Sequence, residues 1–242
     1  MPNKFMKGVL VQFMEAFLLP LPNLIFFQYN PESMTHTWTQ AGGSGSTART
    51  PGRTGGGNPL AVSGYPGESF SFTLAMDSND TLADGNPVTA GIATVSGVYT
   101  RLAALEMLQY PVTSGGAGVL TGSVSVSLGG LTAGLAGGGG TQRSVPSMQV
   151  PTVLFVFGPG RIVPVRVTSL TITEKLYDGL LNPTHAEAVI SLKVLTPQEL
   201  QSVNGPLKQI AQGAYVYSHG LRQALAIANL ANASDTVIGW LG

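Results

Sequence analysis

The amino-acid sequence predicts an α+β fold: a mostly antiparallel, barrel-like or sandwich-like sheet with one packed helix and a helical C-terminal tail. Apolar and polar residues alternate along 69–76 and 186–194, which indicates strands with one buried face. Apolar residues recur at helical spacing over 92–108 and again after 206. The 242 residues suit one large β-rich domain with an appendage, or two small domains. We place the β domain at 1–195 and the helical tail at 196–242.

Two strands and a turn are expected at the N-terminus. Gly8 to Phe13 is apolar and β-branched enough for a strand, and 24–29 makes a second. The Leu-Pro-Leu-Pro stretch at 19–22 predicts an extended connection between them. The Asn-Pro-Glu-Ser sequence at 30–33 predicts a turn, because proline fixes φ.

The middle of the chain holds the best strand and the best helix. Phe70, Phe72, Leu74 and Met76 point to one face, and small polar residues point to the other. Asn86-Pro87 is a plausible helix start. The apolar stripe that follows should pack on the sheet, and it consists of Ile92, Val95, Val98, Leu102, Leu105 and Leu108.

Two glycine-rich insertions, 42–57 and 114–149, interrupt the β domain. Both carry too few apolar side chains to order themselves, so we expect flexible loops there. Within the second, apolar residues at 124, 126 and 128 alternate with serines, which suggests a short hairpin arm.

The last three strands follow 150. The run 153–157 is apolar without alternation and predicts a strand buried on both faces, and glycines at 158 and 160 turn the chain back. Along 163–172 the alternation changes phase near Thr168, which predicts a bulge. Asp178-Gly179 and Asn182-Pro183 mark the next turn. The final strand should bury Ala186, Ala188, Ile190, Leu192 and Val194.

The tail begins at a capping box, in which Thr196 and Glu199 flank a proline at the first helical position. Its apolar seam comprises Leu207, Ile210, Ala214, Tyr217, Leu221 and Ala224. A lone helix of this kind is marginal in water, so it must dock on its own domain or on a neighbour. We expect a neighbour, because the 92–110 helix should already cover the sheet, and we expect the chain ending at Leu195 to fold alone.

The composition of the chain limits the classes of partner and of chemistry that it can have. Lysine plus arginine equals aspartate plus glutamate, and charged residues make up only 10% of the chain. Such a surface favours association, which fits either a poorly soluble monomer or a subunit covered by partners. Nucleic acid is not an expected partner, because phosphates require a basic face. The chain has no cysteine, which excludes disulfides and thiol chemistry.

The apolar N-terminal run is neither a signal peptide nor a membrane span by its pattern. Glu15, Pro20 and Pro22 interrupt it, no small-residue cleavage site follows, and the charge-free stretch 16–27 is too short to cross a bilayer. We therefore expect synthesis in the bacterial cytoplasm without a signal peptide, and no membrane insertion.

Candidate chemistry is weak, and we assign no catalytic residue, no cofactor and no metal. The histidines at 36, 185 and 219 are far apart in sequence. Asp77, Asp80 and Asp84 form either a calcium loop or, more simply, a solvated acidic loop. Glu174 and Glu187 form either an acid–base pair or a charge ladder with Lys175 and Lys193.

A set of short motifs resembles a known family. The segment 7–11, the sequence Phe27-Gln28-Tyr29-Asn30-Pro31-Glu32, and then 67–72, 101–106, 151–158 and 167–179 follow the order of the tube/baseplate adaptors of extracellular contractile injection systems. The resemblance covers roughly residues 7 to 195. Those adaptors often end in a LysM domain, whereas here a helical tail follows Thr196.

The resemblance implies a tail-tube type of β domain and a mechanical role. Copies of the chain would form a ring, expected to be a hexamer, that connects the inner tube to the spike or hub and the baseplate. The particle would be phage tail-like and either cytoplasmic or released. We expect interface residues at the 27–38 turn and in the tail: Phe27, Tyr29, Asn30, Pro31, Trp38, Leu207, Ile210, Tyr217 and Leu221. The alternatives are a β-barrel module that binds a small ligand or glycan, and a virion tail protein of a contractile phage.

Overall fold

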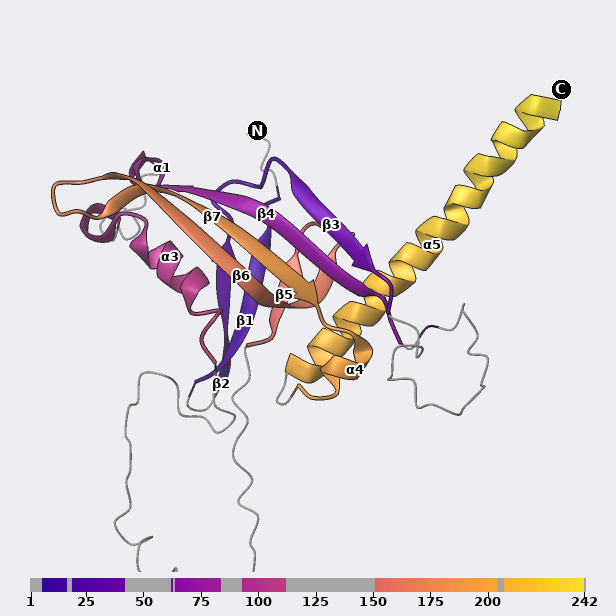
Figure 1. The fold of residues 1–242 in the computed structure, drawn as a ribbon, viewed down its shortest axis with the longest axis horizontal. Coiled ribbons are helices and arrows are strands. Elements are labelled where there is room, and N and C mark those ends of the chain that lie inside the picture. The colour runs from indigo at the N-terminus through magenta and orange to yellow at the C-terminus, as the bar shows by residue number, and fades with distance from the viewer. Residues whose placement is uncertain are drawn as a thin grey trace, which may run out of the picture.

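The computed structural model describes residues 6–16, 19–41, 62, 64–83, 93–111, 151–203 and 207–241, and for 13–16, 19–22, 81, 207 and 231–241 it describes the backbone alone. The strands are β1 (Val9–Ala16), β2 (Leu19–Phe26), β3 (Met34–Thr39), β4 (Gly67–Asp77), β5 (Val153–Val156), β6 (Ile162–Tyr177) and β7 (Pro183–Val194). The helices are α1 (Ser78–Ala83), α3 (Tyr99–Glu106), α4 (Pro197–Leu200) and α5 (Leu207–Leu241) (Figure 1).

The described strands form one seven-stranded antiparallel sheet in the order β2-β1-β5-β6-β7-β4-β3. The sheet curls over itself, since the ring of Phe72 on β4 lies 5.6 Å from Phe27, just after β2, and 5.5 Å from Phe155 on β5. This confirms the α+β class with a mostly antiparallel sheet.

The expected closure into a barrel is wrong, because β2 and β3 are the free edges of the sheet. β2 carries Pro20 and Pro22, which lack backbone N–H groups. A further ladder along that edge would miss those donors, so proline suits an edge strand and opposes closure there.

The alternating strands lie as predicted. Phe70, Phe72, Leu74 and Met76 of β4 are all buried, as are the five predicted core residues of β7: Ala186, Ala188, Ile190, Leu192 and Val194. β6 pairs with β5 through its first residues and with β7 through the rest, and the register shifts between Val167 and Ser169. The predicted bulge is therefore confirmed. In β5, Val153 and Phe155 are fully buried but their neighbours are only half-buried, so burial on both faces was overestimated.

The predicted continuous helix over 92–110 is interrupted. A helical turn at 93–96 ends at Gly97, whose φ is 55°, and α3 starts again at Tyr99. The break lets the Val98 N–H donate to the Pro183 carbonyl oxygen at 2.9 Å, which fixes this segment to the start of β7. Val98, Leu102, Leu105 and Leu108 are buried as predicted, whereas Val95 is 70% exposed.

Two further elements, β3 and α4, contact the tail helix α5. β3 was not predicted: threonine at every second position alternates with Met34, His36 and Trp38, but this alternation does not separate a purely apolar face from a polar one. The capping box of α4 is present: the Thr196 side chain accepts from the Glu199 N–H, and the Glu199 side chain accepts from the Thr196 N–H.

Four predicted features lie outside the described residues: the insertions 42–57 and 114–149, the alternating residues 124–128 and the helix start at Asn86-Pro87.

Candidate functional site

The 27–31 signature contributes mainly to folding. Phe27 is 2% exposed and packs on Phe72 and Phe155, so its side chain belongs to the core of its own domain. The Asn30 side chain accepts from the Gly8 N–H at 2.9 Å and donates to the Met6 carbonyl at 2.8 Å. A Cβ on Gly8 would lie 2.5 Å from the Phe27 ring, so glycine is required at this close approach. The 27–31 signature therefore holds the segment that leads into β1 against the core.

Gln28, which the sequence argument did not single out, joins three elements. Its amide donates to the Asp77 carbonyl at 2.7 Å and accepts from the Asp77 N–H at 2.9 Å, and the Arg101 guanidinium donates to the same amide oxygen. These bonds tie the residue after β2 to the end of β4 and to α3. An uncharged amide with both a donor and an acceptor is the signal in the sequence for such a bridge.

The other signature residues do not form one cluster. The Tyr29 hydroxyl donates to Asp80, and this hydrogen bond, followed by burial, raises the pKa of Tyr29 to about 12. Pro31 is half-buried. Trp38 lies on β3 and is 48% exposed, with the Arg222 guanidinium 4.9 Å from the ring centre. The predicted docking cluster at 27–38 is thus split between the core, the acidic turn and the β3 edge.

An ion cluster attaches α5 to the β3–β4 edge. Glu68 on β4 is 4% exposed and accepts from both terminal nitrogens of Arg222, one of them at 2.9 Å. His36 on β3 lies 2.8 Å from the same carboxylate. Because the acid is buried and its partners come from two other elements, this cluster, which we call the Glu68 latch, fixes the long helix near its middle.

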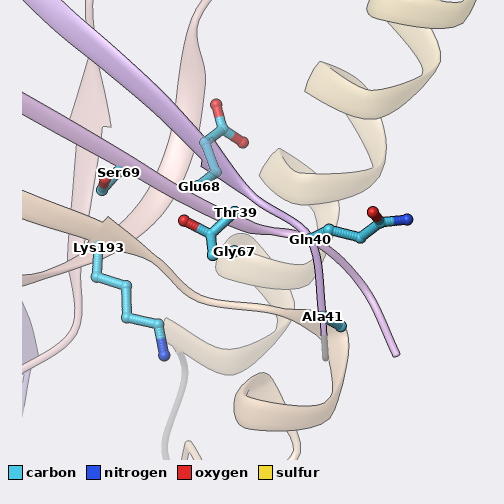
Figure 2. A pocket seen from close by; sticks show the side chains of 7 residues that line it. All are labelled: Thr39, Gln40, Ala41, Gly67, Glu68, Ser69 and Lys193. Carbon is cyan, nitrogen blue, oxygen red and sulfur yellow. The ribbon is translucent and has the colours of Figure 1, made fainter. Parts of the chain in front are cut away.

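A shallow hollow of 390 Å³ borders the latch and is lined by Thr39, Gln40, Ala41, Gly67, Glu68, Ser69 and Lys193. Figure 2 shows the Glu68 carboxylate and the Lys193 amine pointing in opposite directions. Glu68 bonds Arg222, and Lys193 pairs with Glu199 at 2.6 Å. A ligand pocket needs polar groups that converge, and here the charged groups are turned to other partners.

Among the side chains of the sheet that the structure describes, the largest exposed apolar residues gather at the tip of the β6–β7 hairpin. Leu176, Leu180 and Leu181 are 70%, 75% and 77% exposed, and Tyr177 is 54% exposed. Val95 and Tyr99 are also exposed, and the Val95 carbonyl accepts from the Asn182 side chain at 3.0 Å, next to this tip. The sequence signal was available, since three leucines surround an Asp-Gly turn where polar residues are usual.

The turn that carries these leucines is held by polar bonds. Asp178 accepts from the N–H groups of Leu180 and Asn182, both at 2.8 Å, and from the Asn182 side chain at 2.9 Å. The bonds from Asn182 hold the pKa of Asp178 below its usual value. Leu176 and Leu181 have φ of 55° and 64°, a left-handed conformation that costs a leucine roughly 1–2 kcal/mol. A rigid turn therefore presents leucines outward in strained backbone.

The first half of α5 docks on its own sheet. Ala211, Ala214 and Ser218 are buried, and the Ser218 hydroxyl donates to the Ile162 carbonyl at 2.6 Å. Leu195, Leu200 and Ala211 form a second apolar cluster beneath it. Of the two docking places considered for the tail, the one found for this half is its own domain and not the neighbour that we expected, because Ala and Ser at these positions let the helix approach β6 closely.

The predicted seam of the tail is only partly used. Ala214 is buried and Leu221 is half-buried, but Ile210 and Tyr217 are 43% and 49% exposed. The Tyr217 hydroxyl donates to the Pro159 carbonyl at 3.0 Å, so its polar end faces its own domain. Nothing is described for the side chain of Leu207. The C-terminal part of α5 projects away from the sheet (Figure 1), and residues 223–230 are all exposed.

The candidate chemical groups resolve into structural pairs. Glu187 pairs with Lys175 at 2.6 Å, and this hydrogen bond lowers the pKa of Glu187. Glu174 is opposite Ala186 rather than Glu187. Of the predicted charge ladder the structure contains the Lys175–Glu187 pair, whereas Lys193 pairs with Glu199 instead. Within the described part of the chain, no three histidine or acidic side chains gather as a metal site, and none of the helices is long and apolar enough to cross a membrane.

Comparison of the sequence with protein-family models and with curated proteins gives no match.

Proposed function

We propose that this protein is a non-catalytic structural subunit of a bacterial contractile injection particle, acting as a ring-forming adaptor between the inner tube and the spike or baseplate. The observation that carries the proposal is the placement of two exposed apolar surfaces. The β6–β7 tip and the projecting half of α5 lie at opposite ends of the molecule's longest axis (Figure 1). An adaptor between two layers of a particle needs such a surface at each end.

The strained leucines support the same role. Exposed leucine in left-handed backbone is unfavourable in a free monomer on both counts, since it costs conformational energy and leaves apolar area in water. Burial against another subunit offsets the second cost. The neutral surface and the family-like order of the 27–32, 67–72 and 167–179 motifs agree with an assembled subunit.

The test is co-assembly with the inner-tube subunit encoded in the same genome. We expect the purified chain to form rings in negative-stain images and to cap tubes. Leu181→Asn should reduce capping at least tenfold without lowering the melting temperature, because asparagine tolerates the left-handed conformation and removes the apolar contact. Gly179→Ala, at the same turn with open space around its Cβ position, is the matched control.

Two outcomes would overturn the proposal. One is a chain that stays monomeric both alone and with the tube subunit. The other is turnover of peptidoglycan or an ester that disappears when a single acidic residue is changed, since that would make the protein an enzyme.

A further inference from the structure

The far face of α5 carries an uncharged seam that nothing in the described structure covers. With about 100° per residue, the docked positions 211, 214, 218 and 222 centre on one side of the helix. Val216, Gly220, Gln223, Ile227 and Leu230 fall on the opposite side. All are exposed: Val216 is 70%, and Ile227 and Leu230 are each 67% exposed.

The spacing of this far seam points to another helix as its partner. Its members are separated by 4, 3, 4 and 3 residues, and the numbering continues the series at Ser234, Val237 and Leu241. A straight helix drifts by roughly 20° per heptad from such a repeat, so a seam kept in this register suits a partner that winds around it. The docked positions 211, 214, 218 and 222, which lie toward the sheet, are instead separated by 3, 4 and 4 residues.

Two of the glycines of α5, Gly213 and Gly220, lie on this side, seven residues apart. Glycine is unfavourable inside a helix, yet a Cβ at Gly213 or Gly220 would meet nothing within 4 Å, and neither has a positive φ. The domain itself therefore gives no reason for them. A helix that crosses closely at these two positions gives one.

Charge selects the partner. Between Gln223 and Gly242 the only charged residue is Asp235. A membrane-surface helix would carry lysine and arginine on its polar face, and a charged protein groove would need complementary charges, and this segment offers neither. Identical helices of this composition meet without like-charge repulsion, with Ile227 and Leu230 at the seam and alanines beside them.

We propose that the far seam of α5 pairs with the same seam of a second copy of this chain. The inference rests on the self-association that the proposed function requires, and it names the surface through which the copies meet. α5 then has two roles along its 35 residues: its inner face anchors it through the Glu68 latch, and its outer face joins copies.

The experiment measures the mass of the full chain by sedimentation as a function of concentration. We expect reversible self-association, with the dissociation constant raised at least tenfold by Ile227→Glu or Leu230→Glu. Asn229→Glu adds the same charge on the other side of the same helical turns and should leave the constant unchanged. Near-ultraviolet circular dichroism, which reports the fold of the sheet domain, should be the same in all variants.

Gly220→Ala should change the stability of the dissociated chain and the strength of its self-association in opposite directions. The extra methyl should raise the melting temperature of the dissociated chain, because alanine favours helix, and should weaken association, because it blocks the close approach. A monomer at every concentration up to about 100 μM, or equal effects of Glu at 227 and 229, overturns the pairing. Tube capping that survives in the Ile227→Glu variant would leave the proposed function standing alone.

Discussion

Gly97 is where the chain's local preference yields to a single backbone contact. The residues around Gly97 favour a helix, yet its φ is 55°. The N–H of the next residue, Val98, donates a hydrogen bond to the Pro183 carbonyl oxygen on β7. A Cβ at this position would lie 2.3 Å from the Pro183 carbonyl oxygen, a distance that real side chains do not adopt. Glycine is thus required by both conformation and space, and the helical periodicity of the surrounding apolar residues conceals it.

We expect Gly97→Ala to lower the free energy of unfolding by about 2 kcal/mol or more, from left-handed strain plus the forced shift of β7. Gly179→Ala, where nothing lies within 4 Å, should change it by less than about 0.5 kcal/mol. Denaturant unfolding of both variants measures the difference. Equal effects at the two sites would mean that the helical segment does not contact Pro183.

At the scale of the element, the Glu68 latch decides how the long helix leaves the domain. Glu68 sits on β4 with its carboxylate buried, and its charge is met by Arg222 from α5 and by His36 from β3. Arg222 also lies over the Trp38 ring, so the helix is fixed to the edge strand by charge and by stacking. Burial and the nearby Arg222 lower the pKa of Arg161, which lies over Phe70 on the same side.

Removing Arg222 should be costly. Arg222→Met leaves the buried carboxylate with only His36, and we expect a loss of about 2–3 kcal/mol in unfolding free energy, below the value for a fully buried pair because the arginine is a third exposed. Adding Glu68→Gln to that variant should recover part of the loss. A double-mutant cycle by chemical denaturation tests this, and strictly additive losses would show that the two side chains do not interact.

The same elements show what the sequence could predict. Strands with alternating burial, the bulge near Thr168 and the capping box at Thr196 each depend on neighbouring residues, and all three were found. β3, the break at Gly97 and the inward face of α5 depend on partners distant in sequence. No local pattern indicates that Arg222 meets Glu68, which lies 154 residues away.

Prediction of the candidate surfaces likewise depended on whether the signal was local in the sequence. The aromatic signature at 27–31 predicted an exposed turn, but the curl of the sheet placed Phe27 against Phe72 and Phe155 instead. The exposed leucines at 176–181 belong to an apolar run in a turn. An exposed apolar surface could have been predicted there from this local signal, but it was not. Closure of the sheet was expected from the resemblance, whereas the open edges come from which strands pair.

At the scale of the whole molecule, the charge balance and the shape act together. A chain with zero net charge and few charged residues has little repulsion between copies. Its apolar surfaces are nevertheless not spread evenly: one lies at the β6–β7 tip and the other along the projecting half of α5, at opposite ends (Figure 1). If the proposed function holds, we expect association through these two surfaces, along the long axis.

Two truncations separate folding from assembly at this scale. A chain ending at Gln223 keeps the docked face of α5 and the Glu68 latch, so its melting temperature should stay within about 2 °C of the full chain. A chain ending at Leu195 loses the Leu195–Leu200–Ala211 cluster and the partner of Glu68, a cost of at least about 3 kcal/mol, which corresponds to a fall of roughly 6–12 °C. Calorimetry measures both values, and sedimentation should find both chains monomeric. If the chain ending at Leu195 melts like the full chain, α5 does not belong to the fold; if the chain ending at Gln223 still self-associates, the copies meet through the sheet and not through the far seam.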